Sequence, residues 1–282
     1  MIYKTLIDSA TLQSEYQKGT WQIFDCRSYL TDQDKGRLLY QTSHIPDAHF
    51  FDMESDLSSR ITDISGRHPL PDFETLAQKL SRCGVKQGVQ VVVYDDMQGA
   101  MASRLWWLLR YMGHGDVAVL DGGLQAWQAF NGKMTDSLPE PSEGDFTVQL
   151  PFQNTSYLST TDIVKKLELL QIVDARARPR FLGEVEPIDS VAGHIPGSVN
   201  RPFQENLSED GVFKSAQQLA HEWAERVDLT KPVVHMCGSG VTACHNILAM
   251  SHAGFDNSIL YAGSWSEWIR DTARPISTED TK

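Results

Sequence analysis

The stretch VVHMCGSGVTACHNILAM (residues 233–250) decides the fold because its character changes twice. It opens as a short, β-branched apolar run, which is typical of a strand buried on both faces of a parallel sheet. A glycine-rich turn follows from Gly238 to Thr242, and a helical pattern runs on to His252. A strand, a tight turn and a helix in succession indicate an α/β fold.

The rest of the chain contains this organisation twice, since four landmarks recur in the same order. They are WQIFDCR (21–27) and QIVDAR (171–176), HIPDA (44–48) and HIPGS (194–198), VQVVVYD (89–95) and PVVHMC (232–237), and DGGLQAW (121–127) and AGSWSEW (262–268). The offset between copies is about 149–150 residues for the first two landmarks and about 141–142 for the last two. We therefore infer a duplication with one insertion or deletion between the second and third landmarks.

Within each copy, apolar runs of strand length alternate with helical patterns. We expect strands at Ile23–Cys26, Val89–Tyr94, Val117–Leu120, Ile172–Ala175, Val233–Met236 and Ile259–Tyr261. We expect helices at Leu76–Leu80, Ser103–Met112, Leu124–Phe130, Ile163–Leu170, Ala216–Arg226 and Val241–His252, with Ser215 capping the fifth. The sequence predicts two tandem α/β domains, 1–135 and 157–282, each a parallel sheet flanked by helices, with 136–156 as the linker.

Composition narrows the class of protein. The 282 residues are 41% hydrophobic and carry a net charge of −12, which argues against nucleic acid or an anionic membrane as a partner. No apolar run reaches a membrane-spanning length, and residues 1–17 lack the pattern of a signal peptide. The four cysteines form no CxxC pair and meet no histidine cluster at zinc spacing, so we expect no metal. We expect a cytoplasmic protein with free thiols.

Cys237 is the strongest candidate for chemistry. In open parallel sheets, ligands bind beyond the carboxyl ends of the strands, and Cys237 ends one of them. The glycines of the turn allow successive N–H groups to point inward, as an anion-binding nest at a helix N-terminus. Such a field stabilises a thiolate, and equally a persulfide anion. We expect the turn residues Gly238, Gly240, Val241 and Thr242 to hold a bound anion.

The first copy has Asp95 in the place of Cys237. An aspartate cannot carry sulfur, so we expect this copy to be catalytically inactive. Its carboxylate is suited to capping the N–H groups of its own loop, in place of the anion that a substrate would supply.

These motifs resemble the tandem-rhodanese sulfurtransferases, which have an inactive first domain and an active second one. HIPDA and HIPGS resemble that family's GHIPGA motif, and RLWWLLRYMGH (104–114) and LDGGLQAW (120–127) match its first-domain pattern. The loop CGSGVTAC (237–244) resembles the 3-mercaptopyruvate sulfurtransferase branch, whereas thiosulfate-preferring members typically carry a cationic CRKGVT loop. The resemblance covers nearly all of the chain.

The resemblance implies roles for further residues. Ser239 would hydrogen-bond and move a proton, and Arg180, in the PRF segment, would bind a substrate carboxylate through its planar fork. The family's second arginine lies in a PEPR segment, where this chain has Ile188. Arg178 or Arg104 could substitute for it, or the preferred donor could differ.

Histidines and the remaining cysteines have competing interpretations. His44, in HIPDA, would face the cleft and join Ser239 in a proton relay, or it would be a structural histidine like its twin His194. Cys244 reads as a small core residue, with redox partnering as the alternative. The Asp25-x-Arg27 and Asp174-x-Arg176 pairs read as buried structural ion pairs, because both copies contain one.

The implied reaction is covalent catalysis in two half-reactions without metal or organic cofactor. Cys237 takes sulfur from 3-mercaptopyruvate as a persulfide, pyruvate leaves, and a thiol such as thioredoxin, a small thiol or cyanide accepts the sulfur. The alternatives are a thiosulfate sulfurtransferase and a persulfide carrier for a partner protein. A phosphatase of the same fold is disfavoured, because the arginine of its C-x5-R loop is replaced by Ala243.

Overall fold

The computed structural model describes residues 2–16, 18–140 and 142–280, which form two compact units. Unit 1 consists of Met1–Ser59, Leu70–Gln153 and Asp210–Val212, and unit 2 consists of Arg60–Pro69, Asn154–Glu209 and Phe213–Lys282. The segment Arg60–Pro69 therefore packs as part of unit 2, although the expected division at residues 135 and 157 assigned it to the first domain. This exchange brings a segment from the first half of the chain to the unit that contains Cys237.

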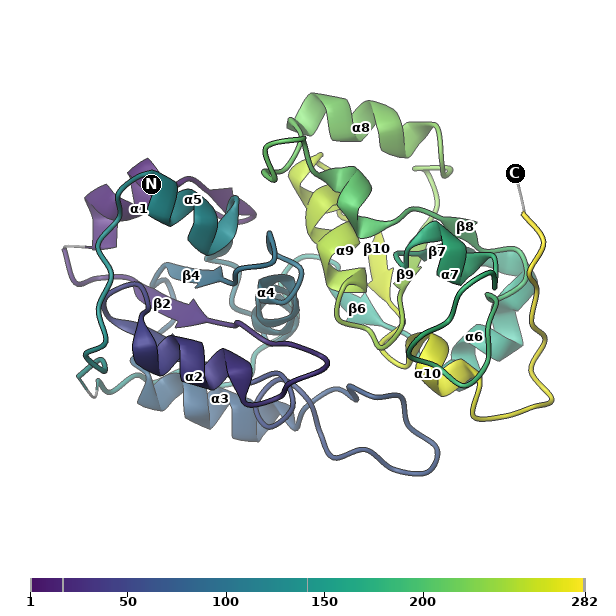
Figure 1. Cartoon of the computed structure of the whole chain (residues 1–282), viewed down its shortest axis with the longest axis horizontal. Coiled ribbons are helices and arrows are strands. Elements are labelled where there is room, and N and C mark those ends of the chain that lie inside the picture. Colours follow the sequence, from purple (N-terminus) through teal and green to yellow (C-terminus); the bar gives the residue numbers. More distant parts are fainter. Residues whose placement is uncertain (1, 17, 141, 281–282) are drawn as a thin grey trace. The chain divides into compact units, whose positions relative to one another are not determined.

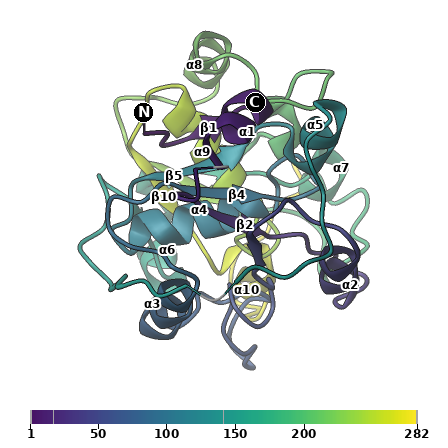
Figure 2. The same ribbon diagram turned by 90° about the vertical axis from the view of Figure 1, so that its left-hand side faces the viewer.

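Unit 1 is a five-stranded parallel sheet covered on both faces by helices (Figures 1 and 2). Its strand order is β1-β5-β4-β2-β3, with β1 Leu6–Ile7, β2 Gln22–Asp25, β3 Ala48–Phe50, β4 Val91–Tyr94 and β5 Val117–Leu120. Its helices are α1 Ser9–Tyr16, α2 Lys35–Thr42, α3 Phe73–Arg82, α4 Ala102–Tyr111 and α5 Gly123–Ala129. Figure 2 shows α1 and α5 on one face of the sheet, and α3 and α4 on the other.

Unit 2 repeats this topology, with strand order β6-β10-β9-β7-β8 (Figure 1). Its strands are β6 Ser156–Tyr157, β7 Gln171–Asp174, β8 Val199–Asn200, β9 Val233–Met236 and β10 Ser258–Leu260. Its helices are α6 Thr160–Lys166, α7 Arg178–Phe181, α8 Ala216–Ala224, α9 Ala243–His252 and α10 Ser264–Trp268, with 3₁₀ turns at Leu167–Leu169 and Phe203–Asn206. The α/β fold class and the duplication expected from the sequence are both confirmed.

The sheets and their covering helices follow the predicted apolar pattern closely. Strands β5 and β9 have the predicted bounds, and the other four predicted strands shift by one or two residues. Ser215 caps α8 by accepting a hydrogen bond from the N–H of Gln218 at 3.2 Å. Alternate residues of each central strand pack against opposite helix layers, so these strands are apolar on both faces. The pattern did not indicate the edge strands of two or three residues, because so short a run carries no periodicity.

Each unit contains a buried ion pair directly after a central strand. Arg27 Nη2 lies 2.7 Å from Asp25 Oδ2, and Arg176 Nη2 lies 2.7 Å from Asp174 Oδ2. Both pairs are almost completely buried, and each arginine also donates to a main-chain carbonyl just before the HIPDA or HIPGS motif. The predicted structural ion pairs are thus confirmed in both copies. They fix the carboxyl edge of each sheet, where the loops after β4 and β9 begin.

His235, on β9, is a buried histidine two residues before Cys237. Its ring is fully buried, and neither ring nitrogen has a hydrogen-bond partner in the described part of the chain. Burial, with a smaller contribution from the nearby Arg201 cation, lowers its pKa from 6.5 to about 3. The folded protein therefore holds His235 neutral at pH values where the unfolded chain takes up a proton.

This difference predicts an acid-sensitive stability. The contribution of neutral His235 is complete above pH 6.5 and is lost progressively as the pH falls towards 3. We expect the free energy of unfolding at pH 5 to be about 2 kcal/mol lower than at pH 7 because of this residue. Urea unfolding at pH 7 and pH 5 measures this loss of unfolding free energy. The loss should be smaller in His235→Leu than in wild type. His221→Leu, at an exposed position, is the control and should lose as much stability as wild type. An equal loss in His235→Leu and wild type would contradict this role of His235.

Within residues 2–16, 18–140 and 142–280, no helix is both long and apolar enough to cross a membrane. The same residues contain no cluster of three or more histidine, cysteine or acidic side chains that could hold a metal ion.

Candidate active site

Cys237 lies directly after β9, at the carboxyl edge of the unit 2 sheet, and is only 2% exposed. Its loop is fixed to the start of α10: the N–H of Trp265 donates to the carbonyl of Cys237 at 3.0 Å, and that of Ser266 to the carbonyl of Gly238 at 2.9 Å. Gly240 has φ +81°, and a Cβ there would lie 2.3 Å from the carbonyl oxygen of Ala262. This position therefore requires glycine, which explains the sequence of the turn.

The loop after Cys237 presents main-chain N–H groups to the thiol. The N–H of Gly240 donates to Cys237 Sγ at 3.1 Å. The amides of Ser239, Val241 and Ala243 have no hydrogen-bond acceptor in the parts of the chain that the structure describes. The loop therefore has donors to spare for an anion at the sulfur.

In the corresponding loop of unit 1, the carboxylate of Asp95 occupies the place of a bound anion. Asp95 follows β4 as Cys237 follows β9, and it is completely buried. Its Oδ1 accepts from the N–H groups of Met97 and Gly99 at 2.8 Å, and its Oδ2 accepts from those of Met101 and Ala102 at 2.7 Å. Burial raises the pKa of the Asp95 carboxyl, and the four N–H groups act against that rise. The prediction that Asp95 caps its own loop is confirmed.

The unit 1 loop indicates what the unit 2 loop can hold. The donors to Asp95 at Met97, Gly99 and Met101 correspond by position to Ser239, Val241 and Ala243, whose amides have no acceptor among the described residues. An aspartate oxygen lies two bonds beyond Cβ, and so does the outer sulfur of a cysteine persulfide. A persulfide on Cys237 would therefore put its terminal anionic atom where Asp95 puts its oxygens. The loop is built for an anion of that reach, larger than the thiolate alone.

Ser239 and a histidine that we did not predict form a hydrogen-bonded pair beside Cys237. Ser239 Oγ lies 2.7 Å from Nδ1 of His68, and both residues are buried. His68 belongs to the Arg60–Pro69 segment of unit 2. A serine hydroxyl bonded to an imidazole can accept or deliver a proton near neutral pH. This pair can therefore carry out the proton transfer expected of Ser239, with His68 as its partner.

Arg180 lies near the loop in a network of carboxylates. Its Nε lies 3.0 Å from both oxygens of Glu186, and its Nη2 lies 2.7 Å from Glu186 Oε1 and 3.0 Å from Asp189 Oδ2. Burial disfavours ionisation of Glu186, but hydrogen bonds from Arg180 and from the amides of Asp189 and Ile188 outweigh it and lower its pKa. Glu186 therefore stays ionised and orients the guanidinium. A Cβ on Gly238 would lie 3.7 Å from Arg180 Nη1 and Nη2.

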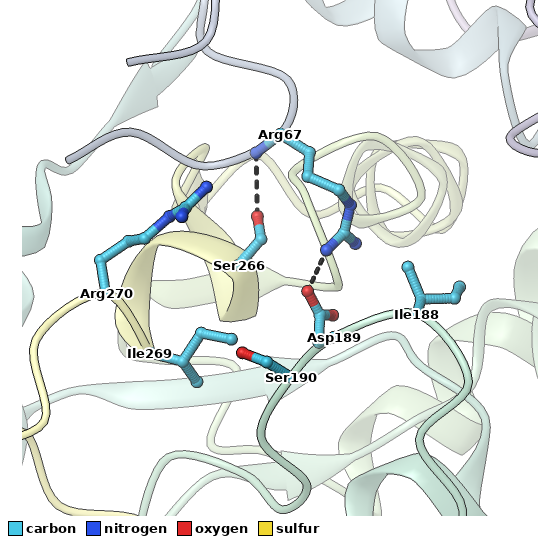
Figure 3. A pocket seen from close by; sticks show the side chains of 7 residues that line it. All are labelled: Arg67, Ile188, Asp189, Ser190, Ser266, Ile269 and Arg270. Carbon is cyan, nitrogen blue, oxygen red and sulfur yellow. Dashed lines mark hydrogen bonds and ion pairs between the residues drawn. The ribbon is translucent and has the colours of Figure 1, made fainter. Parts of the chain in front are cut away.

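A pocket of about 430 Å³ adjoins this network (Figure 3). Figure 3 shows the side chains of Arg67 and Asp189 pointing toward one another, with Ile188 beside them. The lining residues are Arg67, Ile188, Asp189, Ser190, Ser266, Ile269 and Arg270. Ser266 connects the pocket to the catalytic loop, because its amide bonds to Gly238 and its Oγ accepts from the amide of Arg67 at 3.0 Å.

The structure places the candidate residues in two groups. Cys237, Gly238, Ser239, Gly240, Val241, Thr242 and Arg180 all lie in unit 2, together with Arg67 and His68, which sequence reasoning missed. One signal pointed to the missed pair: the segment Arg60–Pro69 falls between the second and third landmarks of the first copy, where the change in offset requires an insertion or deletion.

His44 has a structural environment in unit 1. Its ring is fully buried, and its Nδ1 and Nε2 lie 2.6 and 3.1 Å from the carbonyl oxygens of Tyr40 and Ser137. Both ring nitrogens lie against main-chain carbonyls of unit 1, which favours the structural alternative for His44, and its twin His194 likewise contacts a carbonyl, that of Phe181. The histidine bonded to Ser239 is His68 instead.

The other open alternatives also have structural explanations. Cys244 is fully buried within α9, and its thiol donates to the carbonyl of Gly240 at 3.5 Å, which fits a core residue. Arg178 pairs with Asp280 at the exposed surface of unit 2. Arg104 is completely buried in unit 1, where it contacts the carbonyl of Leu57. Arg178 is thus engaged by Asp280 and not by the carboxylates that hold Arg180.

Comparison with known proteins identifies one family for both units of the chain. The rhodanese-like domain family matches residues 8–130 and 159–271. A probable 3-mercaptopyruvate sulfurtransferase of Pseudomonas aeruginosa is 46% identical over 280 residues, covering 98% of both chains. A putative thiosulfate sulfurtransferase of Mycobacterium tuberculosis is 37% identical over 279 residues, covering 97% of this chain and 96% of the relative.

Solved structures agree with the sequence comparison. The crystal structure of a 3-mercaptopyruvate sulfurtransferase from Escherichia coli superposes with a TM-score of 0.80 at 34% identity, covering 94% of this chain and all of that one. The match extends over both units, each with the same strand order. With its paired α/β domains and a cysteine at the mouth of an amide-lined loop, this chain belongs to the rhodanese family, in two tandem copies.

Proposed function

We propose that the protein is a sulfurtransferase that takes sulfur from 3-mercaptopyruvate onto Cys237 as a persulfide and passes it to a thiol. One observation carries the proposal: the Cys237 loop has three unused amide donors at the positions that bind the carboxylate of Asp95 in unit 1. A persulfide anion matches that carboxylate in charge and in reach from Cβ. The family membership of the chain and the names of its relatives support the same reaction.

The first half-reaction forms the persulfide. The Cys237 thiolate attacks the donor sulfur, an S–S bond forms, and the C–S bond of the donor breaks with its electron pair remaining on carbon. The donor's thiol proton passes to the pair formed by Ser239 and His68, which delivers it to the enolate carbon, so pyruvate leaves and the persulfide remains as an anion. The loop amides stabilise the persulfide anion in a buried, weakly screened site. Arg180 binds the donor carboxylate with its Nη1, which has no partner in the described chain.

The second half-reaction returns Cys237 to its starting state. A thiolate attacks the outer sulfur of the persulfide, the S–S bond to Cys237 breaks, and the Cys237 thiolate is released. We propose thioredoxin or a small thiol as the acceptor, cyanide as a substitute in the assay, and the reducing cytoplasm as the site of action. The thiols of all four cysteines are free, which suits that compartment.

A specific observation favours thiosulfate as a second donor. The loop itself carries no charge, but guanidinium groups of Arg67 and Arg180 lie 2.8 and 3.7 Å from where a Cβ on Gly238 would be. They supply positive charge at the position where the CRKGVT loop has its arginine. A dianion gains from such charge, so some thiosulfate turnover is expected.

A comparison of kcat/KM for the two donors tests the proposal, with cyanide as the common acceptor. We expect 3-mercaptopyruvate to be preferred. Its leaving group is a carbanion that needs a proton, which Ser239 and His68 can supply, whereas the leaving group of thiosulfate is sulfite, which needs none. A higher kcat/KM for thiosulfate, with no pyruvate released from 3-mercaptopyruvate, would overturn the donor assignment.

Arg180→Ala should raise the KM for 3-mercaptopyruvate by roughly 10- to 100-fold, since one charge-assisted contact to the carboxylate is lost. The kcat should change less, because the carboxylate is bound in both ground state and transition state. Steady-state kinetics of pyruvate release measure both constants. An unchanged KM would remove Arg180 from the donor site.

A further inference from the structure

We propose that Arg67 is the second carboxylate-binding cation of the donor site, acting with Arg180 in place of the arginine that is absent at Ile188. The proposal rests on the function proposed above and adds a residue from a different part of the chain. It assigns a binding role to the Arg60–Pro69 segment, which crosses from the first half of the sequence into unit 2.

The guanidinium of Arg67 lies against the nucleophile's neighbour. A Cβ built on Gly238 would lie 2.8 Å from Arg67 Nη2, so any side chain there would displace Arg67. Arg180 Nη1 and Nη2 lie 3.7 Å from the same point. The guanidinium groups of Arg67 and Arg180 therefore both lie beside Gly238, on the side where another residue would have its Cβ. Glycine at position 238 is what allows them to approach.

Asp189 holds the two guanidinium groups side by side. Its Oδ1 pairs with Arg67 Nη1, and its Oδ2 lies 3.0 Å from Arg180 Nη2. The carboxylate is 4% exposed, so solvent screens these pairs little. Each arginine keeps donors that Asp189 does not use: Arg180 Nη1 and Arg67 Nη2 have no partner among the described residues. Two convergent donor groups suit the two oxygens of a carboxylate.

The backbone of the Arg60–Pro69 segment is anchored at the same place. The amide of Arg67 donates to Ser266 Oγ at 3.0 Å, and Arg270 Nε donates to the carbonyl of Ser65 at 3.2 Å. A Cβ on Gly66 would lie 2.6 Å from the carbonyl oxygen of Gly263, so this glycine allows the close approach. The backbone from Ser65 to Arg67 is thus held by contacts with unit 2 residues at three successive positions. A preorganised cation loses little freedom when it binds an anion.

Ile188 lies where an arginine could serve the same anion. It lines the pocket with Arg67 and Asp189, is 45% exposed, and its amide is held by Glu186 Oε1 at 3.1 Å (Figure 3). Its apolar side chain offers no charge to a ligand. The two positions therefore face one space from different segments, and a cation at either can contribute to the same site.

The test is a set of four variants assayed for pyruvate release: Arg67→Met, Ile188→Arg, the double variant Arg67→Met/Ile188→Arg, and Arg178→Met. Arg67→Met should raise the KM for 3-mercaptopyruvate roughly 10- to 100-fold, as expected for losing one charge-assisted contact, with a smaller change in kcat. The double variant should recover most of that loss. Arg178→Met removes a surface cation of the same unit and should leave the KM unchanged.

The outcomes separate this proposal from the proposed function. If wild type releases no pyruvate, the proposed function fails. If wild type is active and Arg67→Met has an unchanged KM, Arg67 is not in the donor site. If the KM rises in Arg67→Met but does not recover in the double variant, Arg67 does not act in place of an arginine at position 188. A matching thermal unfolding midpoint for all variants excludes loss of folding as the cause. The KM of Arg67→Lys, which keeps the charge, should lie between those of wild type and Arg67→Met.

Discussion

Cys237→Ser is expected to abolish sulfur transfer, lowering kcat by roughly 10³-fold or more and leaving no sulfur on the protein. A serine hydroxyl cannot accept sulfur from the donor, and no other thiol lies in the amide loop. Steady-state turnover with 3-mercaptopyruvate and cyanide, together with the intact mass after donor treatment, measures both effects.

Two matched variants make this result specific. Cys244→Ser changes a fully buried thiol in the first turn of α9, and it should keep both turnover and the added sulfur. Cys237→Asp copies the situation of Asp95 in unit 1, whose carboxylate accepts four main-chain hydrogen bonds. It should be inactive and at least as resistant to thermal unfolding as Cys237→Ser, because the loop amides gain an acceptor. Persistence of activity in Cys237→Ser, or its loss only in Cys244→Ser, would refute the mechanism.

Ser239→Ala is expected to lower kcat for 3-mercaptopyruvate by roughly 10²- to 10⁴-fold, the usual contribution of a positioned acid or base. The hydroxyl of Ser239 links the loop to His68 through a 2.7 Å contact with its Nδ1. Without it, the enolate released from the donor sulfur loses the proton donor that this pair provides. The KM should change less, since the carboxylate contacts of Arg180 are untouched.

Comparison of donors distinguishes proton transfer from positioning. Thiosulfate leaves as sulfite and needs no proton on carbon, so Ser239→Ala should retain most of its thiosulfate turnover. His68→Gln should reproduce the donor-selective loss, whereas His44→Gln should not, because both ring nitrogens of His44 lie against main-chain carbonyls of unit 1. Equal losses with both donors would show that Ser239 shapes the loop and does not transfer protons.

Much of the fold could be predicted because it depends on local pattern. The central strands are continuous apolar runs, and the duplication repeats them in the same order, so both sheets and most covering helices followed. The role of Asp95 was also predictable, since an acidic side chain at the start of a glycine-containing loop has few other partners. The edge strands β1 and β6 were missed because pairs of residues show no period.

The contacts of the site were less predictable because they join distant segments. His68 and Ser239 are separated by 171 residues, and Arg67 and Asp189 by 122. No local pattern relates such positions, so the sequence offers only His44, the histidine in a recognisable motif, as a candidate for the relay, with a structural role as the alternative. The change in offset indicates an insertion or deletion in this region, but only the structure shows that the Arg60–Pro69 segment packs in unit 2.

The most direct measurement is the intact mass of the protein after brief treatment with 3-mercaptopyruvate in the absence of an acceptor, followed by peptide mapping. We expect one added sulfur atom, located on Cys237, with one pyruvate released per chain and loss of the added mass when a thiol is supplied. Pyruvate release without added sulfur, or a sulfur located on Cys26, Cys83 or Cys244, would contradict this mechanism.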